Sequence, residues 1–541
     1  MSPTDPTDPT NGTPLFDRLL RLAAARPDAV ALVRGRRDGS GRPVTFARLA
    51  AGCLRTAEAL REAGVAPGQR AVVMTRNPDE LTAVVYALML IGAVPLLVDP
   101  GLPRRDLCVC LDEAAPEVFV GEPLAHLARR VLGWARGHVR VPVTTGRRLA
   151  ALDDALAGRL PPPAEPPDAG PAARAPADAD LAVIAFTSGS TGVPKGVEYR
   201  YATLAGQLDA LATVLVPREP TVLLSGFLPF VLFGPALGVT TVAPAVNHRA
   251  PIRTPPERIL RPLLEHRATV LAASPAMLRL LAEHCARRGL TLPSVDRVVS
   301  FGAPLHAGTG GRLRAVLRPD AELLSVYGAT ECLPVSAVNV ADLDEPGPAG
   351  GAAGTCLGPP LPGLRVRVLD ADRGGVGEVA VAGPNVSPAY HARPEANAAA
   401  KLTTKGGLLH RTGDMGRLDD LGRLWFHGRR AHQVRGAGFT LNTEDVEAAA
   451  GRVPGVRRAA LVGVGAPGRQ RAVLCAELAG ARRDRPGVLD ALRGVLADHP
   501  EGRRVETVLV HPRLPTDIRH NAKIDRERLA AWAAPRLRGR P

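Results

Sequence analysis

The sequence predicts an α/β protein: a large N-terminal domain of stacked α/β subdomains, followed by a small C-terminal α+β domain. At 541 residues the chain is too long for a single hydrophobic core. Amphipathic helical patterns alternate with short apolar strand patterns over most of its length, which indicates sheets covered by helices. Towards the C-terminus the elements become shorter and mixed. We therefore expect a disordered leader at residues 1–14, an N-terminal domain at residues 15–427 and a C-terminal domain at residues 428–541.

The N-terminal region begins with the helical pattern LFDRLLRLAAARP and the strand pattern RAVVMT. The run Leu81–Val98 that follows is uncharged and has the minimum length of a membrane-spanning helix. Glycine and proline interrupt it, so we predict a helix that ends at Gly92 and a short buried strand that ends at Asp99. The leader has neither a basic start nor an apolar stretch. We expect no signal peptide and no transmembrane segment.

The second half of the N-terminal domain starts after a Pro- and Ala-rich stretch at residues 161–177, which we predict to be a surface linker. Strand patterns recur at TVLAAS, RVVSFG and ELLSVYG, separated by helical patterns such as SPAMLRLLAEHCARRG. In the C-terminal domain the helix NTEDVEAAAG has Asn442 as its expected N-cap and Gly451 just past its end. Strands RAALVGVG, RAVLCAEL and VETVLV and helices GVLDALRGVLADH and DRERLAAWAA complete this domain.

Charge, aromatic content and cysteine pattern indicate which binding partners and which cellular compartment to expect. The formal charge is +15, but the arginines are spread over the whole chain and the aromatic fraction is 3%. No basic stripe alternates with stacking rings, so we expect no nucleic-acid partner. The seven cysteines form no CxxC pair, and an odd, scattered set fits a reducing compartment. We predict buried or idle thiols, no disulfide, no structural zinc and a cytoplasmic location.

The stretch FTSGSTGVPKGVEYR follows the apolar strand pattern LAVIAF and carries most of the functional signal. Its glycines allow the backbone to turn so that several N–H groups point at one centre, and its hydroxyls and Lys195 add donors and a positive charge. Such a loop binds phosphate. It is not a Walker A loop, because Gly196 follows Lys195 where Ser or Thr is required. Taken alone, the stretch also fits a flexible linker.

Four further motifs follow this loop in order. YGATE, residues 327–331, comes after a strand pattern and offers an aromatic face, a hydroxyl and a carboxylate. RTGD, residues 411–414, supplies an acid suited to a ribose diol, and GRR, residues 428–430, lies at the predicted domain boundary. HNAKIDR places a single lysine, Lys523, near the C-terminus. Each alone is equally well explained as a turn, a cap or a solvated charge, but the ordered set indicates nucleotide chemistry.

With these motifs the chain resembles the adenylate-forming superfamily of acyl-CoA ligases, peptide-synthetase adenylation domains and luciferases, from about residue 15 to residue 535. The resemblance implies a magnesium-dependent reaction of a carboxylate with ATP. It also implies two nucleotide-binding elements. The loop for the β- and γ-phosphates comprises Thr187, Ser188, Gly189, Ser190, Thr191, Gly192 and Lys195. The adenine pocket comprises Gly302, Ala303 and Pro304 as a wall, with Tyr327 and Gly328 closing it.

The same resemblance implies the catalytic residues. Thr330 contacts the α-phosphate, Glu331 binds magnesium, and Asp414 and Arg429 contact the ribose. Lys523 lies on a mobile C-terminal lid and bridges the carboxylate and the α-phosphate during adenylation. A cation at that point neutralises the charge that develops in the in-line transition state.

Three departures from the superfamily pattern narrow the resemblance. The hinge position two residues after Arg429, usually Asp or Lys, is Ala431. Tyr201 stands where a histidine usually follows the loop, and the segment Phe227–Val242 is apolar where an aromatic–His pair is usual. With strings such as RAHQV and TDIRHNAK, the chain most resembles the olefin-pathway β-lactone synthetases, although Tyr201 departs from that branch too.

That branch implies an ATP-dependent β-lactone synthetase. A long-chain, 2-alkyl-substituted 3-hydroxy fatty acid is adenylated, and its own hydroxyl then closes the ring and releases AMP. The segment Phe227–Val242 is then a candidate acyl pocket, with ordinary core as the alternative. A fatty acyl-CoA ligase, a fatty acyl-AMP ligase and a catalytically silent binding protein remain open. The resemblance also implies work alongside other hydrocarbon or lipid biosynthesis enzymes.

Overall fold

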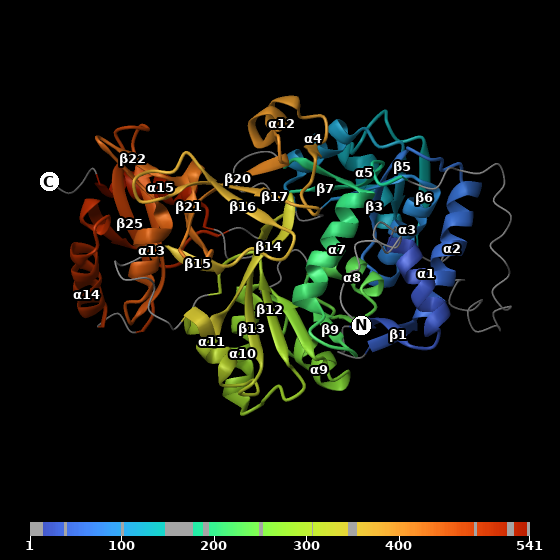
Figure 1. Cartoon of the computed structure of the whole chain (residues 1–541), viewed down its shortest axis with the longest axis horizontal. Coiled ribbons are helices and arrows are strands. Elements are labelled where there is room, and N and C mark those ends of the chain that lie inside the picture. The colour runs from blue at the N-terminus through green and yellow to red at the C-terminus, as the bar shows by residue number, and fades with distance from the viewer. Residues whose placement is uncertain are drawn as a thin grey trace.

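The computed structural model of the chain describes residues 15–36, 41–98, 102–145, 177–187, 194–247, 253–305, 307–343, 354–480, 484–516 and 524–537. The N-terminal elements lie at one end of the long axis of the molecule and the C-terminal elements at the other (Figure 1). The predicted leader, nearly all of the predicted linker, loop residues 188–193 and Lys523 lie outside the described residues.

The first sheet has seven strands in the order β18-β8-β7-β4-β3-β5-β6. The strands from β7 to β6 are parallel, whereas β8 pairs antiparallel with β7 and with β18. Parallel neighbours require crossover connections, and helices α3 to α5 provide them. The strands are Arg70–Met74 (β3), Val94–Leu97 (β4), Val118–Gly121 (β5), Val141–Thr144 (β6), Leu181–Phe186 (β7), Gly196–Arg200 (β8) and Ala389–Tyr390 (β18). The helices are Pro78–Ile91 (α3), Arg104–Ala114 (α4) and Pro123–Leu132 (α5).

The second sheet has eight strands in the order β14-β13-β12-β11-β9-β10-β1-β2, with only the outermost pairs antiparallel. Its strands are Val30–Gly35 (β1), Gly41–Thr45 (β2), Val222–Ser225 (β9), Thr240–Ala243 (β10), Val270–Ala273 (β11), Arg297–Phe301 (β12), Glu322–Ala329 (β13) and Cys332–Asn339 (β14). The helices around it are Leu15–Ala25 (α1), Phe46–Glu62 (α2), Leu228–Ala236 (α8), Glu257–Glu265 (α9), Pro275–Arg288 (α10) and Ala307–Arg314 (α11), and the 3-10 turn η2 covers Val340–Leu343.

Helix α7, Tyr201–Leu215, joins these two sheets and lies at the centre of the molecule (Figure 1). Its first turns bury Leu204 and Leu208 in the core of the seven-stranded sheet. Its last turns bury Leu211 and Val214 in the core beneath β9, β11 and β12. Helix α7 therefore packs on both sheets and contributes to their relative placement.

The third sheet is antiparallel, with the order β15-β21-β20-β17-β16 and β19 paired to β20. Its strands are Thr355–Gly358 (β15), Arg365–Leu369 (β16), Gly377–Ala382 (β17), Lys401–Thr404 (β19), Gly407–Leu418 (β20) and Leu424–Arg429 (β21). Helix α12, Pro394–Ala400, leads from the first sheet into β19. The third sheet lies between the two N-terminal sheets and the C-terminal elements (Figure 1).

The C-terminal elements form the hairpin β22-β23 and the three-stranded sheet β24-β25-β26. Their bounds are Val434–Gly436 (β22), Phe439–Leu441 (β23), Val456–Val464 (β24), Arg471–Leu478 (β25), Val505–Val510 (β26), Thr443–Gly451 (α13), Arg485–Asp498 (α14) and Arg526–Leu537 (α15), with 3-10 turns Arg430–His432 (η3) and Gly502–Arg504 (η5). Two contacts join α13 to the third sheet. The Thr355 hydroxyl donates to Glu444 Oε1 over 2.5 Å, and His427 Nδ1 lies 2.6 Å from Asp445 Oδ1.

The predicted fold class is confirmed, because a large N-terminal assembly of α/β sheets precedes a smaller C-terminal α+β unit. The boundary at residue 428 stays a prediction. The uncharged run near residue 90 divides into a helix and a strand as expected: α3 ends at Ile91, Gly92 caps it with a φ of 81°, and β4 begins at Val94. The strand ends at Leu97, two residues before the predicted Asp99. Within the described ranges, no helix combines the length and apolarity needed to cross a membrane.

Two details of the sequence prediction differ from the structure. Asn442 is the N-cap of α13, but its side chain makes no capping bond to the helix, because Gln433 donates to its Oδ1 over 3.0 Å. Gly451 is the last residue of α13 rather than the first beyond it. The predicted buried thiols are confirmed for six cysteines, and Cys108 is partly buried.

Candidate active site

The two ends of the predicted phosphate loop are held together by their backbones. Thr187 follows β7 and Lys195 precedes β8. The Thr187 N–H donates to the Lys195 carbonyl over 3.0 Å, and the Lys195 N–H donates to Thr187 Oγ1 over 3.1 Å. A Cβ at Gly196 would lie 2.9 Å from the Ile184 side chain, so this glycine allows the strands to approach. The intervening loop residues, Ser188 to Gly192, lie outside the described part of the chain.

Thr330 and Glu331 form the two-residue turn between β13 and β14. The turn is tied to the first sheet, because the Tyr199 hydroxyl of β8 donates to the Thr330 carbonyl. It is tied to the segment before β18 as well, because the Ser387 N–H donates to the Glu331 carbonyl over 2.8 Å. A short turn fixed at both residues presents the Glu331 side chain in a defined direction.

Tyr390 joins Glu331 to two lysines. Its hydroxyl donates to Glu331 Oε1 over 2.7 Å. The Lys195 ammonium lies 4.7 Å from the centre of its ring and the Lys401 ammonium 5.3 Å from it. Lys401 also donates to the Ser387 carbonyl over 2.6 Å. Two ammonium groups and one carboxylate therefore contact the same buried tyrosine. Since the two positive charges outnumber the one negative charge, this cluster is suited to an anionic ligand.

Burial and charge set the protonation states around Glu331. Burial alone raises the pKa of this carboxyl, but His410, the Tyr390 hydroxyl and Lys401 together bring it below its ordinary value. Burial lowers the pKa of Lys401 to about 8. Burial, with Lys401 nearby, lowers the pKa of His410 to about 4. At neutral pH, Glu331 is therefore ionised, Lys401 is mostly protonated and His410 is neutral.

The predicted ribose contacts form a second group with Tyr327. The register of β20 and β21 places Asp414 opposite Arg429, and Arg429 Nε lies 3.1 Å from Asp414 Oδ1. The Tyr327 hydroxyl donates to the other oxygen, Asp414 Oδ2, over 2.6 Å. Burial and the adjacent Asp414 carboxylate raise the pKa of Tyr327, which stays a neutral donor. Asp414 is thereby oriented by two partners from two different sheets.

The predicted adenine wall, Gly302 to Pro304, follows directly after β12, at the carboxyl end of parallel strands where ligands bind in open α/β sheets. Gly302 has a φ of 93°, which favours glycine. The preceding residue, Phe301, packs against two other rings: its ring centre lies 4.7 Å from that of Phe230 and 6.2 Å from that of Phe227. The predicted apolar segment Phe227–Val242 thus begins beside this wall, although α8 within it is mostly buried and the core explanation holds for that part.

The structure places several of the predicted residues in two groups, and it also shows where two departures from the superfamily pattern lie. Lys195 and Glu331 meet at Tyr390, whereas Tyr327 and Asp414 form a second group with Arg429. Strand β13 carries Tyr327 and ends two residues before Glu331, so one hairpin contributes to both groups. Tyr201 has a core role instead, because its buried hydroxyl donates to the Met89 carbonyl over 3.1 Å. Ala431 lies exposed in η3.

The sequence prediction missed Tyr390, Lys401, His410 and Tyr199. One signal was available, because the chain contains only five tyrosines. Three of them, Tyr199, Tyr327 and Tyr390, donate hydrogen bonds at this site. This scarcity is a signal for Tyr199, which lies within the loop motif, whereas Tyr390 lies in none of the motifs.

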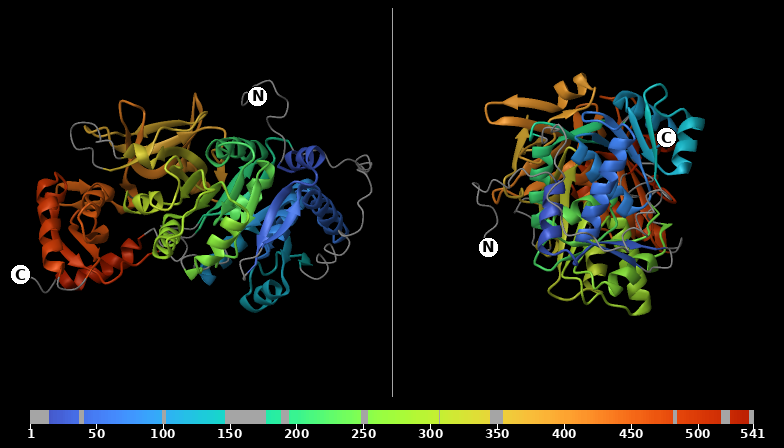
Figure 2. Two further views of the ribbon diagram at one scale, coloured as in Figure 1. Left: turned by 90° about the horizontal axis from the view of Figure 1, so that it is seen from below. Right: turned by 90° about the vertical axis from the view of Figure 1, so that its right-hand side faces the viewer.

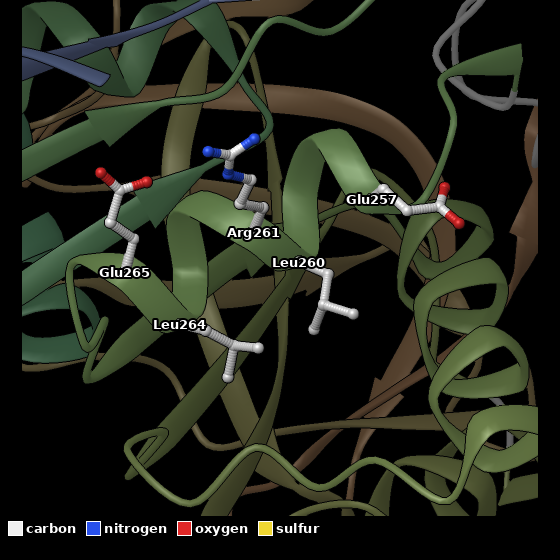
Figure 3. A pocket seen from close by; sticks show the side chains of 5 residues that line it. All are labelled: Glu257, Leu260, Arg261, Leu264 and Glu265. Carbon is white, nitrogen blue, oxygen red and sulfur yellow. The ribbon is translucent and has the colours of Figure 1, made fainter. Parts of the chain in front are cut away.

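An open hollow elsewhere on the surface is unrelated to this site. It lies on α9, where Leu260 and Leu264 point to one side of the helix and Arg261 and Glu265 to the other (Figure 3). None of the residues that line it belongs to the predicted set.

Comparison with known proteins identifies the family of the chain. Residues 19–391 match the family of AMP-binding enzymes. The chain belongs to this family, and it is an ATP-dependent, adenylate-forming ligase.

Within the family, the chain is similar to particular relatives. It is 42% identical to the olefin β-lactone synthetase of Stenotrophomonas maltophilia, over 97% of this chain and 98% of the relative. It is 40% identical to the olefin β-lactone synthetase of Xanthomonas campestris, over 95% of this chain and 96% of the relative. Among solved structures, the amide bond synthetase McbA of Marinactinospora thermotolerans superposes with a TM-score of 0.76 at 26% identity, covering 96% of this chain and 99% of McbA.

Proposed function

We propose that this chain is a β-lactone synthetase that acts on a long-chain, 2-alkyl-substituted 3-hydroxy fatty acid. The observation that carries the proposal is the 42% identity to an olefin β-lactone synthetase over 97% of the chain. The reaction has two steps, adenylation of the carboxylate and closure of the ring by the acid's own hydroxyl.

In the first step a carboxylate oxygen attacks the α-phosphorus of ATP, and the bond to the bridging oxygen breaks to release pyrophosphate. We assign the leaving phosphates to the loop from Thr187 to Lys195, with Lys401 as an additional cation near them. The two ammonium groups that contact the Tyr390 ring, against the one carboxylate bonded to its hydroxyl, support this assignment. We assign the bridging of carboxylate and α-phosphate to Thr330 and to Lys523 of the C-terminal lid.

We assign nucleoside binding to the group built around Asp414. The bonds from Tyr327 and Arg429 fix the direction of the Asp414 carboxylate, and a carboxylate is an acceptor suited to the two hydroxyls of a ribose. The adenine then lies between the Gly302–Pro304 wall and the Tyr327–Gly328 segment, both at the carboxyl end of the eight-stranded sheet.

The residues around the site fit a magnesium ion held by few protein ligands. In nucleotide sites Mg²⁺ is bound by one or two carboxylates together with phosphates and water. Across the described residues, no three His, Cys, Asp or Glu side chains gather as a metal site. Glu331 is ionised, fixed by its turn and bonded at Oε1 by Tyr390, and we propose it as the protein ligand. When bound, the ion supplies neutralising charge at the phosphoryl oxygens.

In the second step the hydroxyl oxygen attacks the activated carbonyl carbon. The bond from that carbon to the adenylate oxygen breaks, AMP leaves and the hydroxyl proton is released. The step is intramolecular, so positioning of the chain raises the effective concentration of the nucleophile. The exposed Ala431 in η3 supports closure without a thiol, because this position lacks the charged hinge residue of the resembled ligases. The aromatic cluster beside Gly302 supports an acyl-binding region that starts at Phe227.

The proposal includes a cytoplasmic location and work alongside other hydrocarbon- or lipid-forming enzymes. The scattered, mostly buried cysteines support the first part. The word olefin in the names of the two relatives supports the second.

AMP formation without any thiol tests the proposal. The purified chain is given ATP, Mg²⁺ and either the 3-hydroxy acid or the same acid without its hydroxyl. We expect repeated turnover with the hydroxy acid only, since the other acid forms an adenylate that has no internal nucleophile. Equal turnover with both acids contradicts ring closure. Turnover that requires CoA identifies the chain as a fatty acyl-CoA ligase.

A further inference from the structure

Helix α5 has its apolar and polar sides reversed relative to a helix that packs on a core. Leu124, Leu127 and Val131 recur at helical spacing on one face. Their exposed fractions are 61%, 58% and 69%. No residue of α5 is buried. These three side chains, which we name the α5 stripe, are among the most exposed large apolar residues of the described chain.

The side of α5 that faces the protein carries the small Ala125, which packs on the core, together with His126 and Arg129. His126 bonds the Val143 carbonyl through Nε2 over 3.0 Å, and its ring packs against Phe119 at 5.0 Å. The Arg129 guanidinium lies 5.5 Å from the centre of the same Phe119 ring. Because histidine and arginine face the protein, the leucines and the valine of the α5 stripe face water. Exposure of apolar surface to water is unfavourable in free energy. The orientation is therefore best explained by a surface that covers the stripe.

The segment of the chain that carries the α5 stripe is basic. From residue 123 to residue 140 the chain carries four arginines and no Asp or Glu. Arg130, Arg136 and Arg140 are exposed. Arg104 of α4 reaches the end of α5, where it donates to the Leu132 carbonyl over 3.5 Å. The nearest acid at the other end, Glu122, is paired with Arg76 over 2.8 Å. Among the described residues, Arg130, Arg136 and Arg140 form no ion pair, and an apolar stripe flanked by such arginines is complementary to an anionic lipid surface.

The position of α5 in the fold agrees with peripheral docking. Helix α5 packs beside β5 and β6, the edge of the seven-stranded sheet opposite to β7 and β8, which hold the candidate active site. In both views of Figure 2 this teal part of the ribbon lies at the outer edge of the molecule. With ten residues, α5 is far too short to span a bilayer, so it lies in the interface.

We propose that the α5 stripe and its arginines dock the protein on an anionic lipid surface. The apolar side chains enter the boundary between headgroups and acyl chains, and the arginines bind the headgroup phosphates. This goes beyond the proposed reaction and does not depend on it, because none of these residues belongs to the candidate active site.

Flotation of the full chain with phosphatidylcholine vesicles, with and without phosphatidylglycerol, tests the proposal. We expect binding only to the anionic vesicles, decreasing as salt is added. The triple variant Leu124→Gln, Leu127→Gln, Val131→Gln should weaken binding at least about tenfold, since glutamine keeps helix propensity but not apolarity. The pair Arg130→Gln and Arg136→Gln should weaken it by roughly ten- to thirtyfold, at about one kcal/mol per arginine.

Leu421→Gln is the matched control, because Leu421 is 74% exposed in the turn before β21, outside this region. It should bind vesicles like the unchanged chain. Absence of binding to anionic vesicles, or equal loss in the control, overturns the proposal. So does a chain that self-associates in solution and becomes monomeric in the triple variant, since the stripe is then a contact between copies. All variants should release pyrophosphate normally with a short, water-soluble hydroxy acid, so a failure of docking is distinguishable from a failure of the proposed reaction.

Discussion

Replacing Tyr390 with phenylalanine removes one oxygen atom from the candidate active site and little else. The ring stays, so the contacts of Lys195 and Lys401 with its face are kept. The lost atom is the donor to Glu331 Oε1 at 2.7 Å. If Glu331 binds magnesium, the Tyr390 hydroxyl holds the Glu331 carboxylate in position. Tyr390→Phe then tests that positioning role alone.

The expected size follows from the kind of hydrogen bond. A bond to a charged group contributes about 1.5–3 kcal/mol. Each 1.4 kcal/mol corresponds to about tenfold in an equilibrium constant. We therefore expect the apparent affinity for Mg·ATP to fall by roughly 10- to 100-fold. The pKa of Glu331 should also rise, because the Tyr390 bond is one of the interactions that lower it. The acid limb of the pH profile should move to higher pH.

Exchange of labelled pyrophosphate into ATP, measured against Mg²⁺ concentration and pH, reports both effects. Tyr201→Phe is the control: it also removes a buried tyrosine hydroxyl, bonded to the Met89 carbonyl at 3.1 Å, but at a distance from the site. It should lose about 0.5–1.5 kcal/mol of stability and keep normal exchange. The reasoning is refuted if Tyr390→Phe exchanges normally at every Mg²⁺ concentration, or if both variants lose exchange to the same extent.

Three other changes test separate parts of the account. Asp414→Asn removes the charge that pairs with Arg429 and should weaken ATP binding by at least about tenfold, as measured by calorimetry, whereas unchanged binding contradicts the ribose assignment. Lys523→Ala should lower pyrophosphate release by about 10²–10³ while ATP still binds, and full release refutes the lid assignment. Burial raises the pKa of Glu444 to about 7, above its ordinary 4.5, so the folded state holds this proton more tightly than the unfolded chain. The free energy of unfolding should therefore fall as pH rises from about 4.5 to about 7, and denaturant melts of Glu444→Gln should show less of that fall. An identical pH dependence in the variant means that Glu444 does not contribute.

Local signals were sufficient for much of the fold. The division near residue 90 is the clearest example. Gly92, at a positive φ, ends α3, and only two residues separate the end of α3 from the start of β4. Both signals lie within a few residues of the break. The placement of α7 between two sheets is different. Its sequence is apolar on several faces, which indicates burial but not which sheet each turn contacts.

The candidate site divides in the same way. The resemblance named the residues in contiguous motifs, such as Thr330 and Glu331, and the structure places them in one turn. Tyr390 and Lys401 were missed because their position depends on pairing at long range. Strand β18 adds to β8 across about two hundred residues, and only that pairing brings Tyr390 beside Lys195. His410 reaches the cluster through the pairing of β19 with β20.

The most direct test of the central claim is mass spectrometry of the product formed from a long-chain 2-alkyl-3-hydroxy acid with ATP and Mg²⁺, with and without CoA. The acid carries a heavy-oxygen label on its hydroxyl. The account predicts a CoA-independent product that is lighter than the acid by one water and retains the label, because the hydroxyl oxygen becomes the ring oxygen, while unlabelled AMP is released. A thioester that appears only with CoA, or a product that has lost the labelled oxygen, contradicts it.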